Sequence, residues 1–430
     1  MASDTTPSRI MELATTIMAS VAQLQTILSS DDIAPLSFDA DAPTSLPQES
    51  NDISDIILDA TSELYDLLLD PLTLIHEKGA HSNMVCLKAI SHFNIAAIVP
   101  VDGQVSFEEI SDRTGIELQI VRRLLRHAAT MRIFREPAPG QIAHTKASKA
   151  LTGPHMNDFL KVGSGEIWPA TFHMLDAVQK WPNSQEQDET GYALSNPDGR
   201  SLYEVLGSDP ERAMRFSNTM KAFTSRPGYD VSYVLDNYDW GSLGQALVVD
   251  VGGAGGHVAI KLAERFHNLN VIVQDNKKAI AGAGDKVPES LKQRVRFEPH
   301  DFLSPQTTTA DVYYLRWVLH NWSDKYCVMI LRALIPALRP GTRIVIQDTC
   351  MPEPGTIPLW RERQLRVADL NMGALFNARE RSAKEWETLL KEASPKFVLG
   401  DIIFPKGSAL AIFDVWWDTQ GEVPRSQWLA

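Results

Sequence analysis

Residues 246–257 read ALVVDVGGAGGH, and this stretch decides the fold. A mostly apolar run passes directly into a glycine-rich turn, after which Ala259, Leu262 and Ala263 recur at helical spacing. Glycine suits such a turn because the backbone takes positive φ and approaches a ligand more closely than a Cβ atom would allow. The stretch therefore predicts a buried strand, a ligand-binding turn and a helix.

The spacing of the glycines argues against a dinucleotide site. A dinucleotide fingerprint needs G-x-G-x-x-G, and counting from Gly253 the last position is Val258. Acids instead follow the strands, with Asp250 before the turn, Asp275 ending the next strand and Asp301 after the third. A single acid at a strand end could equally cap a helix. Together, without a phosphate-binding loop, the acids suit a ligand with ribose, adenine and positive charge, which predicts S-adenosylmethionine.

Outward from this stretch the chain alternates between strand and helix patterns. Strands are expected at 270–275, 294–299, 311–318 and 342–348, and a helix at 324–338. Two last strands, 397–405 and 409–417, are joined by a turn at 406–408 that is short enough for a hairpin. The predicted fold class is therefore α/β, with a mostly parallel sheet and an antiparallel terminal strand.

The N-terminal part is predicted to be helical. An amphipathic helix at 10–28 precedes a linker at 29–52 that is rich in Asp, Ser and Pro. The stretch 84–99 is apolar on more than one face, which predicts a buried helix that packs against a second subunit. Residues 105–152 follow a winged-helix pattern of helix, turn, helix and short hairpin.

Composition and charge exclude several classes of protein. The 430 residues carry 41 Lys and Arg against 54 Asp and Glu, for a formal charge of -13, which is the wrong sign for binding nucleic acid or an anionic membrane. Arg122, Arg123 and Arg126 in the winged-helix pattern leave DNA binding as a minor alternative. No apolar run is long enough to cross a membrane. The three scattered cysteines predict neither disulfides nor a metal site and favour the reducing cytoplasm.

Motifs along residues 53–417 resemble those of the class I S-adenosylmethionine-dependent O-methyltransferases of the caffeate and flavonoid type, in their fungal secondary-metabolism branch. The segments that carry the resemblance, in order, are VVDVGGAGGHVA, NVIVQD, EPHDFLSP, LRWVLHNWSDKYCVMIL, GTRIVIQDTCMPEPG and NMGALFNARERSAKEW. The resemblance implies a homodimer that uses no metal. It also implies an N-terminal helix and linker at 1–52, a winged-helix dimerisation domain at 53–152, a helical connection at 153–240 and a Rossmann-like methyltransferase domain at 241–430.

The same resemblance assigns cofactor contacts. These are Gly252 and Gly253 at the methionine part, Asp275 at the ribose, Asp301 and Phe302 at the adenine, and Arg316 where plant relatives have a contacting lysine. The chain departs from the family pattern at Ala254, where a glycine is usual, and at Asn321, where an aspartate is common. The first change puts a methyl group near the cofactor, and the second removes a carboxylate beside the motif histidine.

His320 is the predicted general base. It follows the strand pattern at 311–318, at the carboxyl edge of the sheet where open α/β folds bind ligands. A phenolic hydroxyl, with a pKa of about 10, needs a base near neutral pH. The resemblance adds Asp348 and Glu380 as acids beside the imidazole, although Asp348 is shorter than the glutamate of plant relatives. Glu380 could equally be an exposed acid at the start of a helix.

The resemblance and the aromatic content predict the walls of the acceptor pocket at Trp168, Met220, Phe223 and Met372, for which core packing is the alternative. Of these, Met220 and Met372 match family pocket positions. The predicted function is methylation of a hydroxyl on an aromatic or polyketide-like natural product. Two alternatives remain open: a pericyclase or dehydratase that uses the charge of the cofactor without transferring its methyl group, and a DNA-binding regulator.

Overall fold

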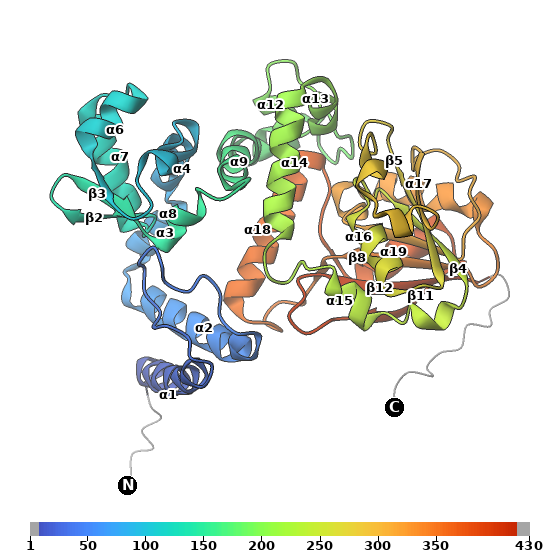
Figure 1. Ribbon diagram of the computed structural model, residues 1–430, viewed down its shortest axis with the longest axis horizontal. Helices are drawn as coiled ribbons and strands as arrows, with labels where there is room; N and C mark the ends of the chain where they lie inside the picture. The colour runs from blue at the N-terminus through green and yellow to red at the C-terminus, as the bar shows by residue number, and fades with distance from the viewer. Residues whose placement is uncertain (1–7, 419–430) are drawn as a thin grey trace, which may run out of the picture. The chain divides into compact units, whose positions relative to one another are not determined.

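The computed structural model describes residues 8–418, which form two compact units (Figure 1). Unit 1 comprises Met1–Pro169, Tyr203–Phe223 and Pro354–Gln364, and unit 2 comprises Ala170–Leu202, Thr224–Glu353 and Leu365–Ala430. Residues 1–7 and 419–430, at the ends of the predicted segments 1–52 and 241–430, lie outside the described residues. The predicted segment boundaries themselves stay predictions.

Unit 1 is mainly helical. Its elements are α1 (Arg9–Ser30), α2 (Asn51–Leu68), α3 (Pro71–Gly79), α4 (His81–His92), α5 (Ile95–Ile98), β1 (Gln104–Ser106), α6 (Phe107–Thr114), α7 (Leu118–Thr130), β2 (Phe134–Ala138), β3 (Gln141–His144), α8 (Lys146–Ala150) and α9 (Met156–Val162). Helix α1 buries Leu13, Leu24 and Leu28 on one face, as the amphipathic pattern predicted, and it packs along α2. Helix α1 ends at Ser30, and a short 3-10 helix at Gln48–Ser50 leads into α2, which begins at Asn51. The linker predicted at 29–52 stays a prediction.

The single helix predicted at 84–99 is wrong. The chain instead forms α4 and α5, because Asn94 between them takes a left-handed conformation with φ of 50°. Asparagine tolerates this conformation better than most residues do. Ile90 and Ile95 are buried in the core of unit 1, whereas Val85 and Phe93 are exposed. The segment is therefore only partly buried within one chain.

The helix, turn, helix and hairpin expected after residue 105 are present. Gly115 ends α6 with a φ of 72°, α7 follows, and β2 pairs with β3, which pairs in turn with β1. Arg122 of α7 is bound to Glu108, and Arg126 to Glu136. These ion pairs occupy two of the three arginines that motivated the DNA-binding alternative. The interpretation of this region as a winged helix stays a prediction.

Unit 2 is built on a seven-stranded sheet with the order β11-β12-β8-β7-β4-β5-β6. Its strands are β4 (Ala246–Val251), β5 (Leu269–Asp275), β6 (Val295–Pro299), β7 (Val312–Arg316), β8 (Arg343–Asp348), β11 (Phe397–Ile403) and β12 (Ala411–Trp417). The first five are parallel to one another, whereas β12 is antiparallel to β8 and β11. This confirms the predicted mostly parallel sheet with an antiparallel terminal hairpin.

Two helical layers cover the sheet of unit 2. Helices α17 (Asp324–Leu334) and α19 (Ala383–Ala393) share one apolar core with Val249, Tyr313 and Ile344 of the strands. Helices α15 (Ser232–Asn237) and α16 (His257–Arg265) share the other core with Val248, Val312 and Val345. Alternate residues of each strand therefore enter opposite cores, as a sheet covered on both faces requires. The result is a three-layer α/β unit.

The remaining α-helices lie in the segments 168–224 and 359–376, where the chain passes between the two units. They are α10 (Trp168–Phe172), α11 (Met174–Lys180), α12 (Gly191–Ser195), α13 (Leu202–Ser208), α14 (Pro210–Thr224) and α18 (Leu359–Phe376), and a short parallel pair is formed by β9 (Cys350–Met351) and β10 (Arg381–Ser382). Several boundaries differ from the sequence prediction: β7 stops at Arg316 rather than at residue 318, β11 stops at Ile403 rather than at 405, and β12 starts at Ala411 rather than at 409. Helix α17 stops at Leu334 rather than at residue 338. Among the described residues, no helix has the length and apolarity needed to cross a membrane.

Gly256 controls how closely α16 approaches the sheet. It caps α16 with a φ of 72°, and a Cβ atom there would lie 2.7 Å from the ring of Phe297 on β6. We expect Gly256→Ala to destabilise the protein by about 2 kcal/mol, because the added methyl group meets both a left-handed backbone and a packed ring. Thermal or urea unfolding measures the effect.

Gly255→Ala is the matched control for this prediction, because a Cβ atom there would meet nothing within 4 Å. The control should unfold close to the wild type. Equal losses for the two variants would contradict the packing argument.

Candidate active site

The first two glycines of the turn after β4, Gly252 and Gly253, have no room for a side chain. Gly252 has a φ of 76°, and its N–H donates to the Gln274 carbonyl at 2.7 Å. A Cβ atom on Gly252 would lie 2.8 Å from the Val318 side chain, and one on Gly253 would lie 2.4 Å from Asp250 Oδ2. Ala254 takes a positive φ of 46° although it carries a methyl group. The space therefore requires glycine at both predicted positions.

Asp250 presents a buried carboxylate beneath this turn. The residue is 2% exposed, and its Oδ2 has no hydrogen-bond partner among the described residues. Burial and the nearby Asp275 raise the pKa of Asp250 to about 7, although Arg316 acts in the opposite direction. A carboxylate in these surroundings is stabilised by a cationic ligand. The turn and this acid thus fit the sulfonium and ammonium groups of the predicted cofactor.

Asp275 braces the turn from the end of β5. Its Oδ2 accepts a hydrogen bond from the Ala254 N–H at 3.0 Å, and its Oδ1 accepts one from the Asn276 N–H at 2.7 Å. Burial raises the pKa of Asp275, although these hydrogen bonds oppose the effect. Oδ1 also accepts the Asn276 side-chain amide at 3.0 Å, so Oδ2 is the oxygen that can accept a further hydrogen bond, which would suit a ribose hydroxyl.

The other predicted cofactor residues lie at neighbouring strand ends. Asp301 is exposed and accepts the Leu303 N–H at 3.0 Å, so it has the turn-capping role that the sequence left open. Phe302 packs edge-to-face against Trp322, with ring centres 5.7 Å apart. Asp301 and Phe302 both follow β6, and Trp322 follows β7, at the edge of the sheet that carries the glycine turn.

Arg316 ends β7 in a fixed orientation. Its guanidinium donates to Gln347 Oε1 at 3.1 Å and to the Tyr229 carbonyl at 2.5 Å. The positive charge is therefore held near Asp250, whose pKa it affects. Gln347 also accepts a hydrogen bond from the Tyr314 hydroxyl at 2.5 Å, which orients the amide.

The structure brings the three predicted catalytic side chains together. His320 Nδ1 lies 3.0 Å from Glu380 Oε1, and the His320 backbone N–H donates to Asp348 Oδ2 at 3.2 Å. The nearest Asp348 oxygen is 3.9 Å from Nδ1, beyond hydrogen-bonding distance, so the shorter acid does not reach the imidazole. The Glu380 side chain is only 3% exposed. The alternative of an exposed acid at a helix start is therefore wrong.

Charges around His320 favour the protonated imidazole. Burial lowers the pKa of His320, but the Asp348 and Glu380 carboxylates outweigh burial and the net pKa is raised. Burial raises the pKa of Asp348 to about 6, with His320 opposing and Glu380 adding to the shift. An imidazole between two carboxylates can take up a proton and keep it stabilised.

Arg381 holds the segment around His320 in place, and the sequence analysis missed it. Its side chain is fully buried and donates to the carbonyl oxygens of Leu319 at 3.2 Å and Trp322 at 2.9 Å, on either side of His320. It also forms an ion pair with Asp324 at 2.8 Å. Parallel pairing of β10 with β9 places Arg381 opposite Cys350, and this brings Glu380 close to Asp348. Its position directly after Glu380 in the family motif was the available signal.

His320, Asp348 and Glu380 also form the kind of group that can hold a metal ion. One ligand atom from each of the three lies within 4.8 Å of the others. His320 Nδ1, however, is already in hydrogen-bond contact with Glu380 Oε1. The sequence prediction that the site uses no metal stays a prediction.

The predicted acceptor-pocket residues fall in different units. Trp168 begins α10, and Met220 and Phe223 lie on α14; all three belong to unit 1, whereas Met372 on α18 belongs to unit 2. Met220 is 37% exposed, so it is not a core residue of its own unit. The grouping of these side chains in one pocket stays a prediction.

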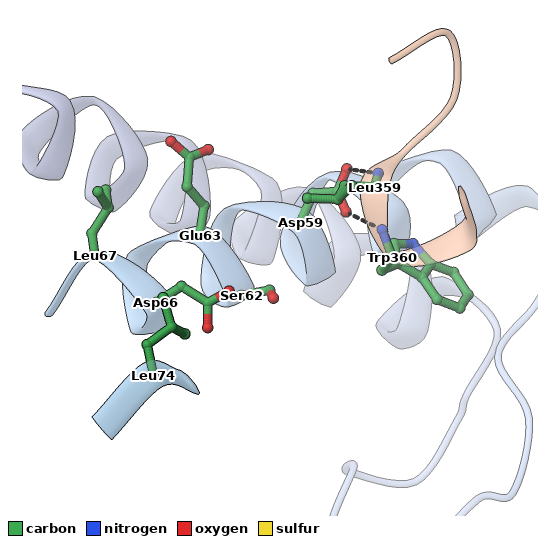
Figure 2. A pocket seen from close by; sticks show the side chains of 8 residues that line it. All are labelled: Asp59, Ser62, Glu63, Asp66, Leu67, Leu74, Leu359 and Trp360. Atoms are coloured by element: carbon green, nitrogen blue, oxygen red, sulfur yellow. Dashed lines mark hydrogen bonds between the residues drawn. The ribbon is translucent and has the colours of Figure 1, made fainter. Parts of the chain in front are cut away.

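A groove in unit 1 contains none of the predicted site residues (Figure 2). Its lining residues are Asp59, Ser62, Glu63, Asp66, Leu67, Leu74, Leu359 and Trp360. Asp59 accepts the backbone N–H groups of Leu359 and Trp360 at 2.7 and 2.8 Å, as the dashed lines in Figure 2 show. Glu63 is bound to Arg9 and Asp66 to Lys78. The acids of the groove are thus engaged within the chain.

Comparisons with known proteins show which family the chain resembles. A family model for the O-methyltransferase domain matches residues 173–395, and one for the O-methyltransferase dimerisation domain matches residues 78–154. The O-methyltransferase PaMT of Phomopsis amygdali is 44% identical over 95% of this chain and 96% of its own length. A chlorophenol O-methyltransferase of Trichoderma longibrachiatum is 36% identical over 96% of this chain and 91% of its own. The structure of LepI complexed with SAM superimposes with a TM-score of 0.73 at 22% identity, covering 94% of this chain and all of that one.

The buried Asp250 should make stability depend on pH. Its pKa is raised in the folded protein, so the stability linked to its proton is present at acidic pH and is lost as pH rises from about 4 through 7. Between pH 5 and pH 8, in the absence of cofactor, the wild type should lose about 2 kcal/mol of unfolding free energy relative to Asp250→Asn, which cannot ionise. Urea unfolding at the two pH values measures the difference.

Asp301→Asn is the control for this comparison, because Asp301 is exposed. It should follow the wild type at both pH values. A constant difference between the wild type and Asp250→Asn across the range would show that Asp250 is ionised throughout.

Proposed function

The chain belongs to the O-methyltransferase family, and from this premise we propose that it transfers the methyl group of S-adenosylmethionine to a hydroxyl of an aromatic or polyketide-like natural product, with His320 as general base. The observation that carries the proposal is the contact between His320 Nδ1 and buried Glu380, at the sheet edge that also carries the glycine turn. The cofactor supplies an electrophilic methyl group on a positively charged sulfur. The chain has to bind it and activate the acceptor.

The turn after β4 supports binding of the cofactor. Gly252 and Gly253 let the turn pack directly against Val318 and Asp250, and the unpartnered oxygen of Asp250 offers negative charge for the cationic part of the cofactor. Asp275, at the end of β5, is the acid assigned to the ribose hydroxyls. Arg316, Asp301 and Phe302 complete the proposed set through their matches to the family motif.

His320 and Glu380 support proton transfer. An ionised Glu380 can only accept a hydrogen bond, so it selects the imidazole tautomer that carries its proton on Nδ1. The Nε2 atom then keeps its lone pair and can take the proton from the acceptor hydroxyl. Glu380 and Asp348 stabilise the imidazolium that results, and the oxygen that has lost its proton becomes the nucleophile.

Relatives support the class of acceptor. The Trichoderma relative is named as a chlorophenol O-methyltransferase, and a phenol is an aromatic hydroxyl whose ionisation needs a base near neutral pH. We propose that Trp168, Met220, Phe223 and Met372 hold the planar acceptor, because aromatic and thioether side chains pack well against aromatic rings.

The free thiols of Cys86, Cys327 and Cys350 suit the reducing cytoplasm, where we place the protein.

The charged catalytic group favours methyl transfer over the alternative of a cofactor-assisted pericyclase or dehydratase. A reaction that uses only the positive charge of the cofactor does not need an imidazole base between two carboxylates. A role in DNA binding is disfavoured by the ion pairs of Arg122 and Arg126 and by the charge of -13.

Replacement of His320 tests the base. His320→Ala should lower turnover about 10²- to 10⁴-fold and leave cofactor affinity within a few-fold, because a general base acts mainly in the transition state. The remaining activity should rise with pH as the acceptor ionises without help. Mass spectrometry of product and of S-adenosylhomocysteine, together with calorimetry of cofactor binding, measures the two effects.

The same assay separates the two enzyme classes. In the wild type, S-adenosylhomocysteine should form in step with product. Replacement of the cofactor by sinefungin, a positively charged analogue without a transferable methyl group, should stop the reaction. Product formation with sinefungin alone would overturn the proposal in favour of the cofactor-assisted alternative.

We also propose that the chain forms a homodimer through unit 1. The dimerisation family model begins at residue 78, within α3. Shortly before this residue, three apolar side chains of α2 and α3 are exposed. Leu72 is 78% exposed, Ile75 69% and Leu68 67%. Burial of such side chains against a second copy provides a hydrophobic driving force.

Light scattering at micromolar concentration should give the mass of a dimer for the wild type. Leu72→Asp combined with Ile75→Asp should increase the monomer fraction, because each charge would have to be buried on association. Met329→Asp, on the partly exposed α17 of unit 2, is the control and should stay dimeric. An active wild-type monomer would contradict the proposal.

A further inference from the structure

Trp317 lies directly after β7 in a backbone conformation that is unusual for a large side chain. Its φ is 54°, in the left-handed region, which costs a residue other than glycine about 1 kcal/mol or more. The surrounding chain holds it there. The Trp317 N–H donates to the Gln347 carbonyl at 3.1 Å, and the Trp317 carbonyl accepts the Asn321 side-chain amide at 3.1 Å.

This conformation coincides with a stack on His320. The indole and imidazole ring centres are 6.0 Å apart, and the ring planes differ by only 13°. Tyr229 packs against the same indole, with ring centres 5.0 Å apart. The imidazole is thus held on two sides, by Glu380 at Nδ1 and by the face of the indole.

An indole face carries partial negative charge and attracts a cation. His320 becomes cationic when it takes up a proton, so the stack is stronger in the protonated state. The charged groups that also act on His320 are Asp348, Glu380 and Arg381, and Arg316 lies 5.8 Å from the centre of the indole ring. The two carboxylates favour the imidazolium, whereas burial and Arg381 oppose it.

We propose that Trp317 is a positioning residue for His320: its strained backbone holds the indole against the imidazole, which fixes the plane of the ring and stabilises the imidazolium during proton transfer. The proposal rests on the proposed function, in which His320 is the base. It accounts for a strained conformation that glycine or asparagine would relieve, at a position beside the predicted catalytic histidine.

Three substitutions separate stacking from packing. Trp317→Phe keeps an aromatic face, Trp317→Leu keeps an apolar side chain without one, and Trp317→Asn relieves the left-handed strain without one. NMR titration of the labelled His320 imidazole, in the protein without acceptor, reports the stack directly. Thermal unfolding reports whether each variant is folded.

We expect Trp317→Phe to keep the His320 pKa close to that of the wild type. Trp317→Leu and Trp317→Asn should lower it by about 0.5 or more. Turnover should fall about tenfold in these two variants, with cofactor affinity within twofold of the wild type. Trp317→Asn should be no less stable than Trp317→Leu, since asparagine suits the left-handed backbone.

An unchanged His320 pKa in a folded Trp317→Asn or Trp317→Leu would overturn the proposal, as would an equal shift in all three variants. The readout stays separate from the proposed function. If His320→Ala kept full methyl transfer, the role of the base would fail, while the titration would still report the stack. Should Trp317→Leu not fold, the comparison of Trp317→Asn with Trp317→Phe decides the question.

Discussion

Parallel pairing joins Val251 of β4 to Gln274 of β5 on one side and to Leu315 of β7 on the other, so the three strands end together. Because the strands run in the same direction, the segments that follow them leave the sheet at one edge. The glycine turn, Asp275 and the segment from Trp317 to His320 are therefore neighbours although the sequence separates them. The apolar cores on both faces hold the strands in this register, and a slip of one residue would turn Asp250 into the opposite core.

A second constraint brings in the acid that the sheet cannot supply. Glu380 lies outside the seven-stranded sheet, and the short pairing of β10 with β9 places it close to Asp348. Arg381, next to it, is fully buried and satisfies the carbonyl oxygens of Leu319 and Trp322. A buried guanidinium with these partners ties the chain around His320 to the strand that presents Glu380. Loss of one partner would leave a buried charge unpaired, which is costly.

The elements that rest on local patterns could be predicted from the sequence. The strand of residues 246–251, the glycine turn and the closing hairpin follow from hydrophobic period and residue type, and they appear at the predicted places. The contact between His320 and Glu380 spans 60 residues and came only from the family resemblance. Left-handed backbone conformations of residues other than glycine are hard to predict from the sequence. Asparagine, as at Asn94, tolerates this conformation, whereas the residue type of Trp317 gives no indication of it. The burial of Arg381 was not predicted, because an arginine is usually exposed, and only its place directly after Glu380 in the motif pointed to it.

The two departures from the family motif differ in their physical consequences. Ala254 carries a methyl group on a backbone with positive φ, but its N–H still donates a hydrogen bond to Asp275, so the turn keeps this contact with the end of β5. Asn321 replaces a common aspartate, and here its amide donates to the Trp317 carbonyl, which an ionised carboxylate could not do. The positive charge of the protonated imidazole is instead stabilised by Asp348, which ends β8, and by Glu380, which directly precedes β10. In this chain Asn321 therefore stabilises the strained segment that carries Trp317. The pKa of His320 is raised by Glu380 and Asp348, which come from distant parts of the sequence.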